Sequence, residues 1–331
     1  MVEVKRDKTL DGLKFLLISL VIFGHAIEPT RYINSFSGIL YSIIYSFHMP
    51  LFVMLSGYFS KKICWVKLNQ QALILLETYL VMAVTMGLVL GYGLRLVVFP
   101  SMSCWYLLSL IFWRYMLYWF INRKKCKSWW LILCSVLIMF ASFVLPINKD
   151  LSVLSFMRSC QYFFFFVIGY CISEDFIAFL RNNIICKSGL WLATIVLFYF
   201  IWVYSSRELH VLEFHRDSMV SLIDQFNWSP FLVLLYKCII LIIALIVSFT
   251  FLTIRKFPKC FEKLGRYTLS FFFLQGIIIH KMVLVLPFNI YLELIVSVGV
   301  ILLGGYIGNK LSWAMNPIST TLRYIKENYV R

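Results

Sequence analysis

The stretch R-D-K-T-L-D-G-L-K-F-L-L-I-S-L-V-I-F-G-H, from Arg6 to His25, decides the fold because its apolar run ends on an imidazole. A histidine is costly to bury in hydrocarbon and is rarely placed there without a function. As a helix, the stretch would separate Asp11 from His25 by about 21 Å, at a rise of about 1.5 Å per residue. We therefore expect Asp11 near the membrane surface and His25 past the midplane.

The composition is that of an integral membrane protein. Of the 331 residues, 61% are hydrophobic and 14% charged, whereas a soluble domain is about 45–50% apolar and about 25% charged. The basic residues behind the net charge of +16 are dispersed among short loops. This pattern indicates attraction to an anionic membrane leaflet and no nucleic-acid partner. The nine cysteines form no C-x-x-C pair, which favours packing or reduced thiols over a disulfide framework or a metal site.

Apolar segments long enough to span a bilayer recur along the whole chain. We predict an all-α polytopic membrane protein, a single domain over residues 1–331, with about ten transmembrane helices. The predicted spans run approximately from 12 to 29, 38 to 60, 70 to 90, 104 to 122, 128 to 146, 157 to 174, 188 to 206, 230 to 254, 267 to 286 and 290 to 312.

The basic residues predict the orientation of these spans. One set of alternate loops, with the two termini, holds 21 of the 31 lysines and arginines, and the other set holds 6. Because cytoplasmic loops carry the excess of Lys and Arg, we expect both termini in the cytoplasm. The long external loop 207–229 contains H-x-x-E-F-H, from His210 to His215. Without a defined third ligand, we interpret it as a solvated loop contacting substrate rather than a metal site.

Three motifs carry a family resemblance: L-D-G-L-K followed by His25, then F-H-M-P-L-F-V-M-L-S-G-Y from Phe47 to Tyr58, then W-Y-L-L-S-L from Trp105 to Leu110. Weaker matches are Arg158 before F-F-F-F-V-I-G-Y and L-G-R-Y-T-L-S from Leu264 to Ser270. Together they resemble the acyltransferase-3 family, multi-spanning membrane acyltransferases of which many O-acetylate cell-surface sugars. The resemblance implies acetyl-CoA as acyl donor and a glycan, or its lipid-linked precursor, as acceptor.

The chain also departs from this family. Members often carry an arginine pair and a proline before a tyrosine entering the third span, where this chain reads N-Q-Q-A-L-I-L-L-E-T-Y. Lys67 could replace one basic residue, and Thr78 occupies the place of the proline. The ninth span commonly contains Y-L-L-H-G, whereas this chain has F-F-L-Q-G with Gln275 at the histidine position.

The resemblance implies that His25 is the catalytic histidine. A neutral imidazole can remove the proton of a sugar hydroxyl as it attacks a thioester, which makes His25 a candidate general base. A transient acetyl-histidine is the alternative. Lys14 lies about three turns earlier on nearly the same helix face and could hold a CoA phosphate, or only snorkel to the interface. Asp11 could fix Lys14 or Arg6, or only cap the helix, and Lys67 is a further candidate for binding the donor.

Four other residues are candidate site residues. His48, just before a proline that can kink the second span, could act in catalysis by orienting the first histidine or the acceptor, or could simply pack. Arg158 could bind an anionic sugar or diphosphate, or anchor its helix at the interface. Trp105 could stack on a sugar ring or belong to an aromatic belt. Glu28, three residues after the candidate base, could share its helix face and contact substrate.

A secondary transporter or a flippase for a lipid-linked sugar is the alternative function. Transporters commonly consist of two repeated halves with paired broken helices, and we find no such symmetry in this sequence. A transporter would use ionisable groups within the spans as a relay, and the candidates are Lys14, His25, Glu77, Arg114, Lys237, Lys281 and Glu293.

Overall fold

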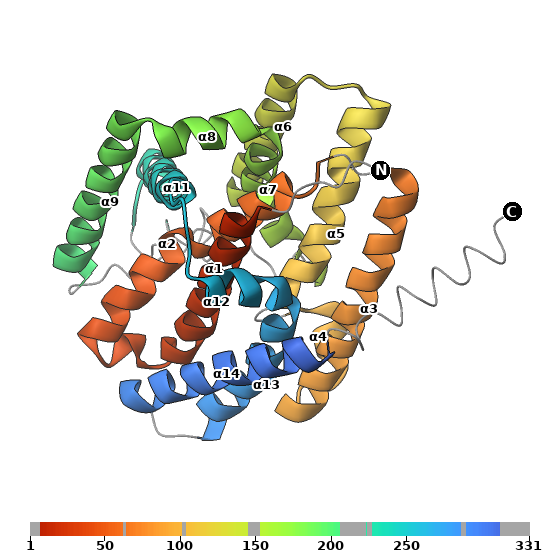
Figure 1. Ribbon diagram of the computed structural model, residues 1–331, viewed down its shortest axis with the longest axis vertical. Helices are drawn as coiled ribbons and strands as arrows, with labels where there is room; N and C mark the ends of the chain where they lie inside the picture. The colour runs from red at the N-terminus through yellow and green to blue at the C-terminus, as the bar shows by residue number, and fades with distance from the viewer. Residues whose placement is uncertain are drawn as a thin grey trace, which may run out of the picture.

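The computed structural model of the protein is all-helical wherever it describes the chain, and Figure 1 shows the helices gathered into one bundle. The structure describes residues 7–61, 64–100, 104–144, 153–205, 223, 227–285 and 289–311. The α-helices are α1 (Lys8–Ile27), α2 (Ser35–Tyr58), α3 (Trp65–Leu90), α4 (Arg95–Val98), α5 (Trp105–Tyr118), α6 (Ser128–Val144), α7 (Phe156–Cys171), α8 (Glu174–Asn182), α9 (Ile184–Ser205), α11 (Pro230–Leu252), α12 (Lys259–Leu264), α13 (Thr268–Val285) and α14 (Ile290–Leu311).

Each predicted span coincides with a helix, and the chain is a multi-pass membrane protein. Among the described residues, seven helices are long and apolar enough to cross a membrane. These seven helices are α1, α2, α3, α7, α9, α11 and α14. The fourth, fifth and ninth predicted spans correspond to α5, α6 and α13. That these three helices also cross the membrane, which would make ten spans, stays a prediction.

The first two helices form the interior of the bundle. In the apolar window of α1 67% of residues are buried, and in that of α2 72%, against 11% in α9 and 22% in α14. Helix α1 packs against α2, α12, α13 and α14, while α2 also packs against α7, α9 and α11. A helix that is apolar all round is either buried in protein or faces lipid. The candidate catalytic motifs on α1 and α2 therefore lie on enclosed spans, and the span that ends with α7 is buried to the same extent as α1.

Two glycines allow α2 and α7 to approach each other closely. A Cβ added at Gly57 would overlap the carbonyl oxygen of Phe166, and one added at Gly169 would overlap that of Met54. Small residues at a helix interface let backbones come into contact in membrane proteins. The S-G-Y and I-G-Y ends of two sequence motifs thus form one helix–helix contact, in agreement with a packing role for Gly57.

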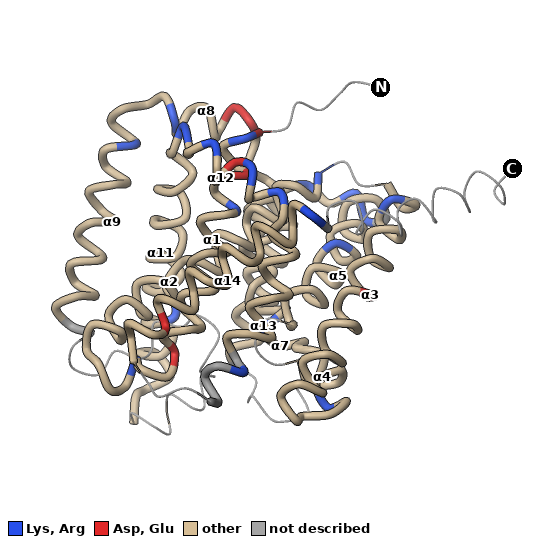
Figure 2. The backbone as a smooth tube through the Cα atoms, turned by 60° about the horizontal axis from the view of Figure 1, so that its bottom comes forward, with Lys and Arg blue, Asp and Glu red and all other residues tan. Residues whose placement is uncertain are grey.

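Charged side chains are distributed unevenly between the two ends of the bundle. Figure 2 shows most Lys and Arg segments at the end that holds α8, α12 and the start of α1. At this end Asp7 caps α1, since its side chain accepts hydrogen bonds from the backbone amides of Thr9 and Leu10. That this basic end faces the cytoplasm stays a prediction. Most of the predicted external loop, with its H-x-x-E-F-H string, lies outside the described residues.

Candidate active site

His25 lies in the last turn of α1, where its side chain is 17% exposed. Its Nδ1 atom is 3.4 Å from Glu28 Oε2 and 3.2 Å from the hydroxyl oxygen of Tyr45 on α2. The imidazole also meets the Tyr45 ring edge to face, with centroids 6.2 Å apart. Because an oriented imidazole needs one nitrogen held by a partner, these contacts on Nδ1 fix the ring.

Glu28 joins the histidine to a buried arginine. Its second carboxylate oxygen accepts a hydrogen bond from Arg31 Nη1 at 3.1 Å. The Arg31 side chain is 7% exposed, whereas that of Glu28 is 42% exposed. The guanidinium lies over the rings of Tyr32 and Tyr41, 4.5 Å from each centroid, so cation–π contacts add to the ion pair. The carboxylate thus has a fixed cation on one side and the imidazole on the other.

The rings of Tyr41, Tyr45 and His48 form a row along α2, and the Tyr45 ring contacts His25. Tyr41 and Tyr45 are one turn apart and stack with centroids separated by 3.8 Å. His48 meets the edge of Tyr45 at 4.7 Å, and its Nδ1 donates to the backbone carbonyl of Ile44 at 2.7 Å. His48 is buried and contacts Tyr45, and in the described part of the chain it makes no hydrogen bond with His25. His48 can therefore act on the candidate base through Tyr45, in addition to its direct electrostatic interaction with His25.

The segment after α1 is also fixed to the last helix. A short 3-10 turn, η1 (Thr30–Tyr32), connects α1 to α2. The Thr30 hydroxyl donates to Glu293 Oε2 on α14 at 2.8 Å and to the carbonyl oxygen of Ile27 at 3.1 Å. The end of α1 and the distant helix α14 therefore both hold the turn that carries Arg31.

Lys14 and Asp11 lie at the other end of α1, near its basic start. Lys14 Nζ is 2.7 Å from Asp11 Oδ1 and lies 4.7 Å from the centroid of the Phe59 ring. Asp11 is buried, and a Cβ at Gly265 would overlap its carbonyl oxygen. Of the two partners predicted for Asp11, Lys14 forms this ion pair and Arg6 lies outside the described residues. The alternative that Asp11 caps the helix is wrong, because Asp7 occupies the cap position.

The remaining predicted site residues lie on other helices. The Arg158 guanidinium on α7 is 5.0 Å from the ring centroid of Trp105 on α5. Trp105 is buried and also packs against Tyr162. Lys67 is exposed on α3. The structure thus places seven of the eight predicted residues in three groups and leaves Lys67 apart. The groups are His25 with Glu28 and, through Tyr45, His48; Asp11 with Lys14; and Trp105 with Arg158.

Comparison with known proteins identifies the class of enzyme. The sequence profile of an acyltransferase domain, that of the acyltransferase-3 family, matches residues 7–309 and so includes every element described above. The chain belongs to the acyltransferase-3 family. It is a membrane acyltransferase, and this family membership implies an acyl donor and an acceptor substrate.

One curated relative shares part of this acyltransferase sequence. The nodulation protein NolL of Sinorhizobium fredii (strain NBRC 101917 / NGR234) is 45% identical over 56 residues. The match covers 16% of the present chain and 15% of NolL. No solved structure is significantly similar.

Two residues that depart from the family pattern, Thr78 and Gln275, lie inside helices of this acyltransferase. Thr78 lies inside α3 and its hydroxyl donates to the carbonyl oxygen of Ile74 at 2.7 Å, so the helix continues where a proline is frequent. Gln275 on α13 is fully buried, and neither its side-chain nitrogen nor its oxygen has a hydrogen-bond partner in the described structure. A carboxamide thus replaces the imidazole of the more common motif within the bundle.

Sequence reasoning missed Tyr45 and Arg31, which lie in the candidate site with His25 and Glu28. Arg31 is one of the six basic residues of the predicted external loops, and the E-P-T-R spacing places it three residues after Glu28. That spacing suits an ion pair on one helical face and was a usable signal. For Tyr45 the signal was weaker, because only the packing of α1 against α2 brings its hydroxyl to His25.

Proposed function

We propose that this acyltransferase moves an acetyl group from acetyl-CoA to a hydroxyl of a cell-surface glycan or of its lipid-linked precursor. The main support for this proposal is that one ring nitrogen of His25 contacts both Glu28 and Tyr45, in a chain that belongs to an acyltransferase family. The sugar acceptor rests on the resemblance in the sequence motifs. The partial similarity to a nodulation protein is compatible with it.

In the proposed reaction, His25 is the general base. Its Nδ1 is engaged by the carboxylate and the tyrosine, so we assign Nε2 to accept the proton of the attacking sugar hydroxyl. The hydroxyl oxygen forms a bond to the acetyl carbonyl carbon, and the carbon–sulfur bond of the thioester breaks. The proton then passes from Nε2 to the departing thiolate, which leaves as the CoA thiol.

Glu28 is proposed as a positioning residue in this scheme, in addition to the substrate contact expected from the sequence. An orienting carboxylate holds the imidazole in one tautomer and stabilises the imidazolium that forms during proton transfer. Arg31 would keep that carboxylate in place, because the guanidinium is itself held between two tyrosine rings. The apolar interior of a membrane has a low dielectric constant, which strengthens such charge interactions.

The proposed donor enters from the basic end of the bundle. Lys14 would hold an anionic part of the donor there, with Asp11 fixing its side chain. Ten further residues of α1, from Phe15 to Gly24, separate Lys14 from His25, and the acceptor would meet the thioester at this far end. The proposal places the protein in a bacterial inner membrane with both termini in the cytoplasm, where CoA is available.

The test is acetyl transfer by the purified protein in liposomes. Acetyl-CoA labelled in the acetyl group is added together with a panel of surface glycans and lipid-linked sugars, and label in each acceptor is measured. The proposal expects label in at least one acceptor and release of an equal amount of CoA thiol. Movement of a sugar across the bilayer without label transfer would overturn it in favour of a transporter.

A further inference from the structure

A second polar site lies at the basic end of the bundle, around Arg114 of α5. Arg114 Nε donates to the Ser60 hydroxyl at 3.2 Å, and its Nη1 donates to Gln71 Oε1 at 3.1 Å. Both partners are neutral, and within the described residues no carboxylate forms an ion pair with this guanidinium. Arginine has five N–H donors, so these two hydrogen bonds leave it able to hold an anion.

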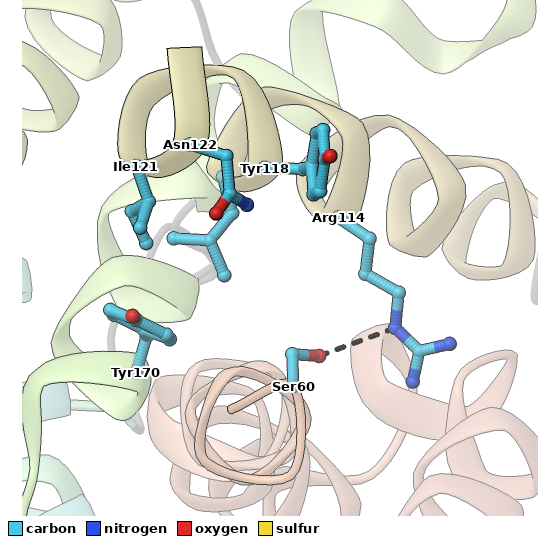
Figure 3. Close-up of a pocket in the computed structure, with 7 residues that line it drawn as sticks. Ser60, Arg114, Tyr118, Ile121, Asn122 and Tyr170 are labelled. Atoms are coloured by element: carbon cyan, nitrogen blue, oxygen red, sulfur yellow. Dashed lines mark hydrogen bonds between the residues drawn. The ribbon is translucent and has the colours of Figure 1, made fainter. Parts of the chain in front are cut away.

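The space beside Arg114 is a partly open cavity of about 120 Å³, lined by polar and apolar groups from α5, α7, the turn after α2 and a π-helical turn (Figure 3). It has room for a few water molecules or for one phosphoryl group, since a water molecule takes up about 30 Å³ of liquid volume. Figure 3 shows side chains of α5, of α7 and of Ser60, just after α2, directed around this space. The lining residues are Ser60, Arg114, Leu117, Tyr118, Ile121, Asn122 and Tyr170.

The helix geometry changes at the rim of this cavity. Helix α5 continues into a π-helical turn, η2 (Trp119–Arg123), which contributes Ile121 and Asn122 to the lining. Such π-helical turns are rare and are frequent at functional sites. The turn leads into the basic loop after α5, where Lys124 lies 5.2 Å from the centroid of the Trp119 ring. An anion that approaches from this end meets positive charge before it reaches Arg114.

An aromatic groove of about 820 Å³ adjoins the cavity and shares Tyr118 and Asn122 with it. Its walls include Trp65 and Trp119, which are 49% and 45% exposed. An indole face can stack on a purine base or pack against an alkyl chain. A pocket that contains the Arg114 guanidinium and adjoins an aromatic groove suits an amphiphilic molecule with a phosphate group.

We propose that the Arg114 pocket binds a phosphate group of such a molecule. Two sources share this chemistry: the phosphates of coenzyme A, with the adenine in the aromatic groove, and a polyprenyl phosphate, with its chain there. The coenzyme A source rests on the acyltransferase function proposed above, whereas the phosphate pocket itself does not depend on it. The competing structural role is that Arg114 only ties α5 to the end of α2, with its head group reaching towards the interface.

The experiment measures equilibrium binding to the protein in nanodiscs of neutral phosphatidylcholine, so that anionic lipid does not compete. The probes are coenzyme A, pantetheine as its counterpart without phosphate, a polyprenyl phosphate and the matching polyprenol. The variants are Arg114→Gln, Arg114→Lys and Asn122→Leu, with Lys263→Gln as a control that removes one exposed charge at the same end of the bundle. The control should match the wild type.

We expect Arg114→Gln to weaken the binding of one phosphate probe about tenfold or more. Arg114→Lys should restore only part of this affinity, because lysine supplies a point charge where arginine supplies a two-pronged donor. Pantetheine and polyprenol should bind Arg114→Gln as they bind the wild type. Loss of coenzyme A binding assigns the donor, and loss of polyprenyl phosphate binding assigns the lipid. Asn122→Leu keeps Arg114 in place and should weaken the binding of the same probe. It therefore tests the pocket if Arg114→Gln proves unstable.

Equal binding of both phosphate probes to the wild type and Arg114→Gln would overturn the proposal, as would failure of both to bind the wild type. Repeating the assay with His25→Ala separates this site from the proposed reaction. That variant should bind the phosphate probe unchanged, since its substitution lies at the far end of α1. Phosphate binding without acetyl transfer would retain the pocket and reject the proposed function.

Discussion

The Glu28 carboxylate lies 3.4 Å from His25 Nδ1, while its other oxygen lies 3.1 Å from Arg31. One acidic side chain, just past the end of α1, therefore connects the candidate base to a buried cation. Glu28→Gln keeps an acceptor for Arg31 but removes the negative charge beside the imidazole. We expect kcat to fall by roughly 10- to 100-fold, less than the ~10⁴-fold cost of losing a buried orienting carboxylate, because Glu28 is half exposed.

The measurement for Glu28 is steady-state acetyl transfer with both KM values determined. A positioning role predicts a loss in kcat with little change in the donor KM, and partial recovery in Glu28→Asp. A rise in acceptor KM with kcat unchanged would instead support the direct substrate contact expected from the sequence.

The Tyr45 hydroxyl is the second group on Nδ1, at 3.2 Å. Tyr45→Phe removes that contact and keeps the ring that packs against Tyr41 and His48. We expect kcat to fall about 3- to 10-fold, the range of one net hydrogen bond of about 0.5–1.5 kcal/mol. Tyr79→Phe is the matched control, because it loses hydrogen bonds to the carbonyl oxygens of Leu96 and Val97 on another helix pair.

For Tyr79→Phe the expected pattern is reversed, with stability lower by about 1 kcal/mol and kcat unchanged. Thermal unfolding in detergent and acetyl transfer, measured on both variants, distinguish the two roles. Loss of stability with full activity in Tyr45→Phe would show that its hydroxyl serves packing alone.

The contact of α2 with α7 should not tolerate a methyl group. Gly57→Ala places a Cβ against the Phe166 carbonyl, and the backbones must separate. Overpacking of this kind costs about 1–3 kcal/mol and occasionally more. Gly189→Ala is the control, since a Cβ there meets nothing within 4 Å, and it should change stability by at most about 1 kcal/mol in the stabilising direction. Equal unfolding temperatures for the two variants would contradict the close approach.

Lys14 and Lys67 are both candidate donor-binding residues, but their surroundings differ. Lys14 is held by a buried Asp11, whereas Lys67 is exposed on α3. Lys14→Gln should raise the donor KM about tenfold at both low and high salt, because partly buried charges are little screened. Any effect of Lys67→Gln should vanish near 1 M salt, where the Debye length is about 3 Å. A Lys14 effect that also disappears in salt would place it among the solvated charges.

The sequence predicted the helices well because the signal for a membrane span is long and compositional. Helix α1 was expected over 12–29 and begins four residues earlier, since Asp7 rather than Asp11 supplies the cap. Shorter elements gave no such signal: the crosswise α8 and the six-residue α12 lie outside the apolar windows that reveal spans. Their placement depends on packing between segments far apart in the chain.

The site was predictable only where its residues are neighbours in sequence. His25 and Glu28 are three residues apart, and Lys14 and Asp11 are also three apart, so helix periodicity gave both pairs. Tyr45 reaches His25 across two helices, and Arg114 reaches Gln71 from α5 to α3. Such contacts follow from tertiary packing, and composition or spacing along the chain does not encode them.

The measurement that tests the central claim most directly is acetyl transfer by wild type, His25→Ala and His48→Ala in membranes with matched amounts of folded protein. The account predicts label in glycan with the wild type, none above background with His25→Ala, and retained though reduced transfer with His48→Ala, whose ring contacts Tyr45 rather than His25. Equal transfer by the wild type and His25→Ala would contradict the account.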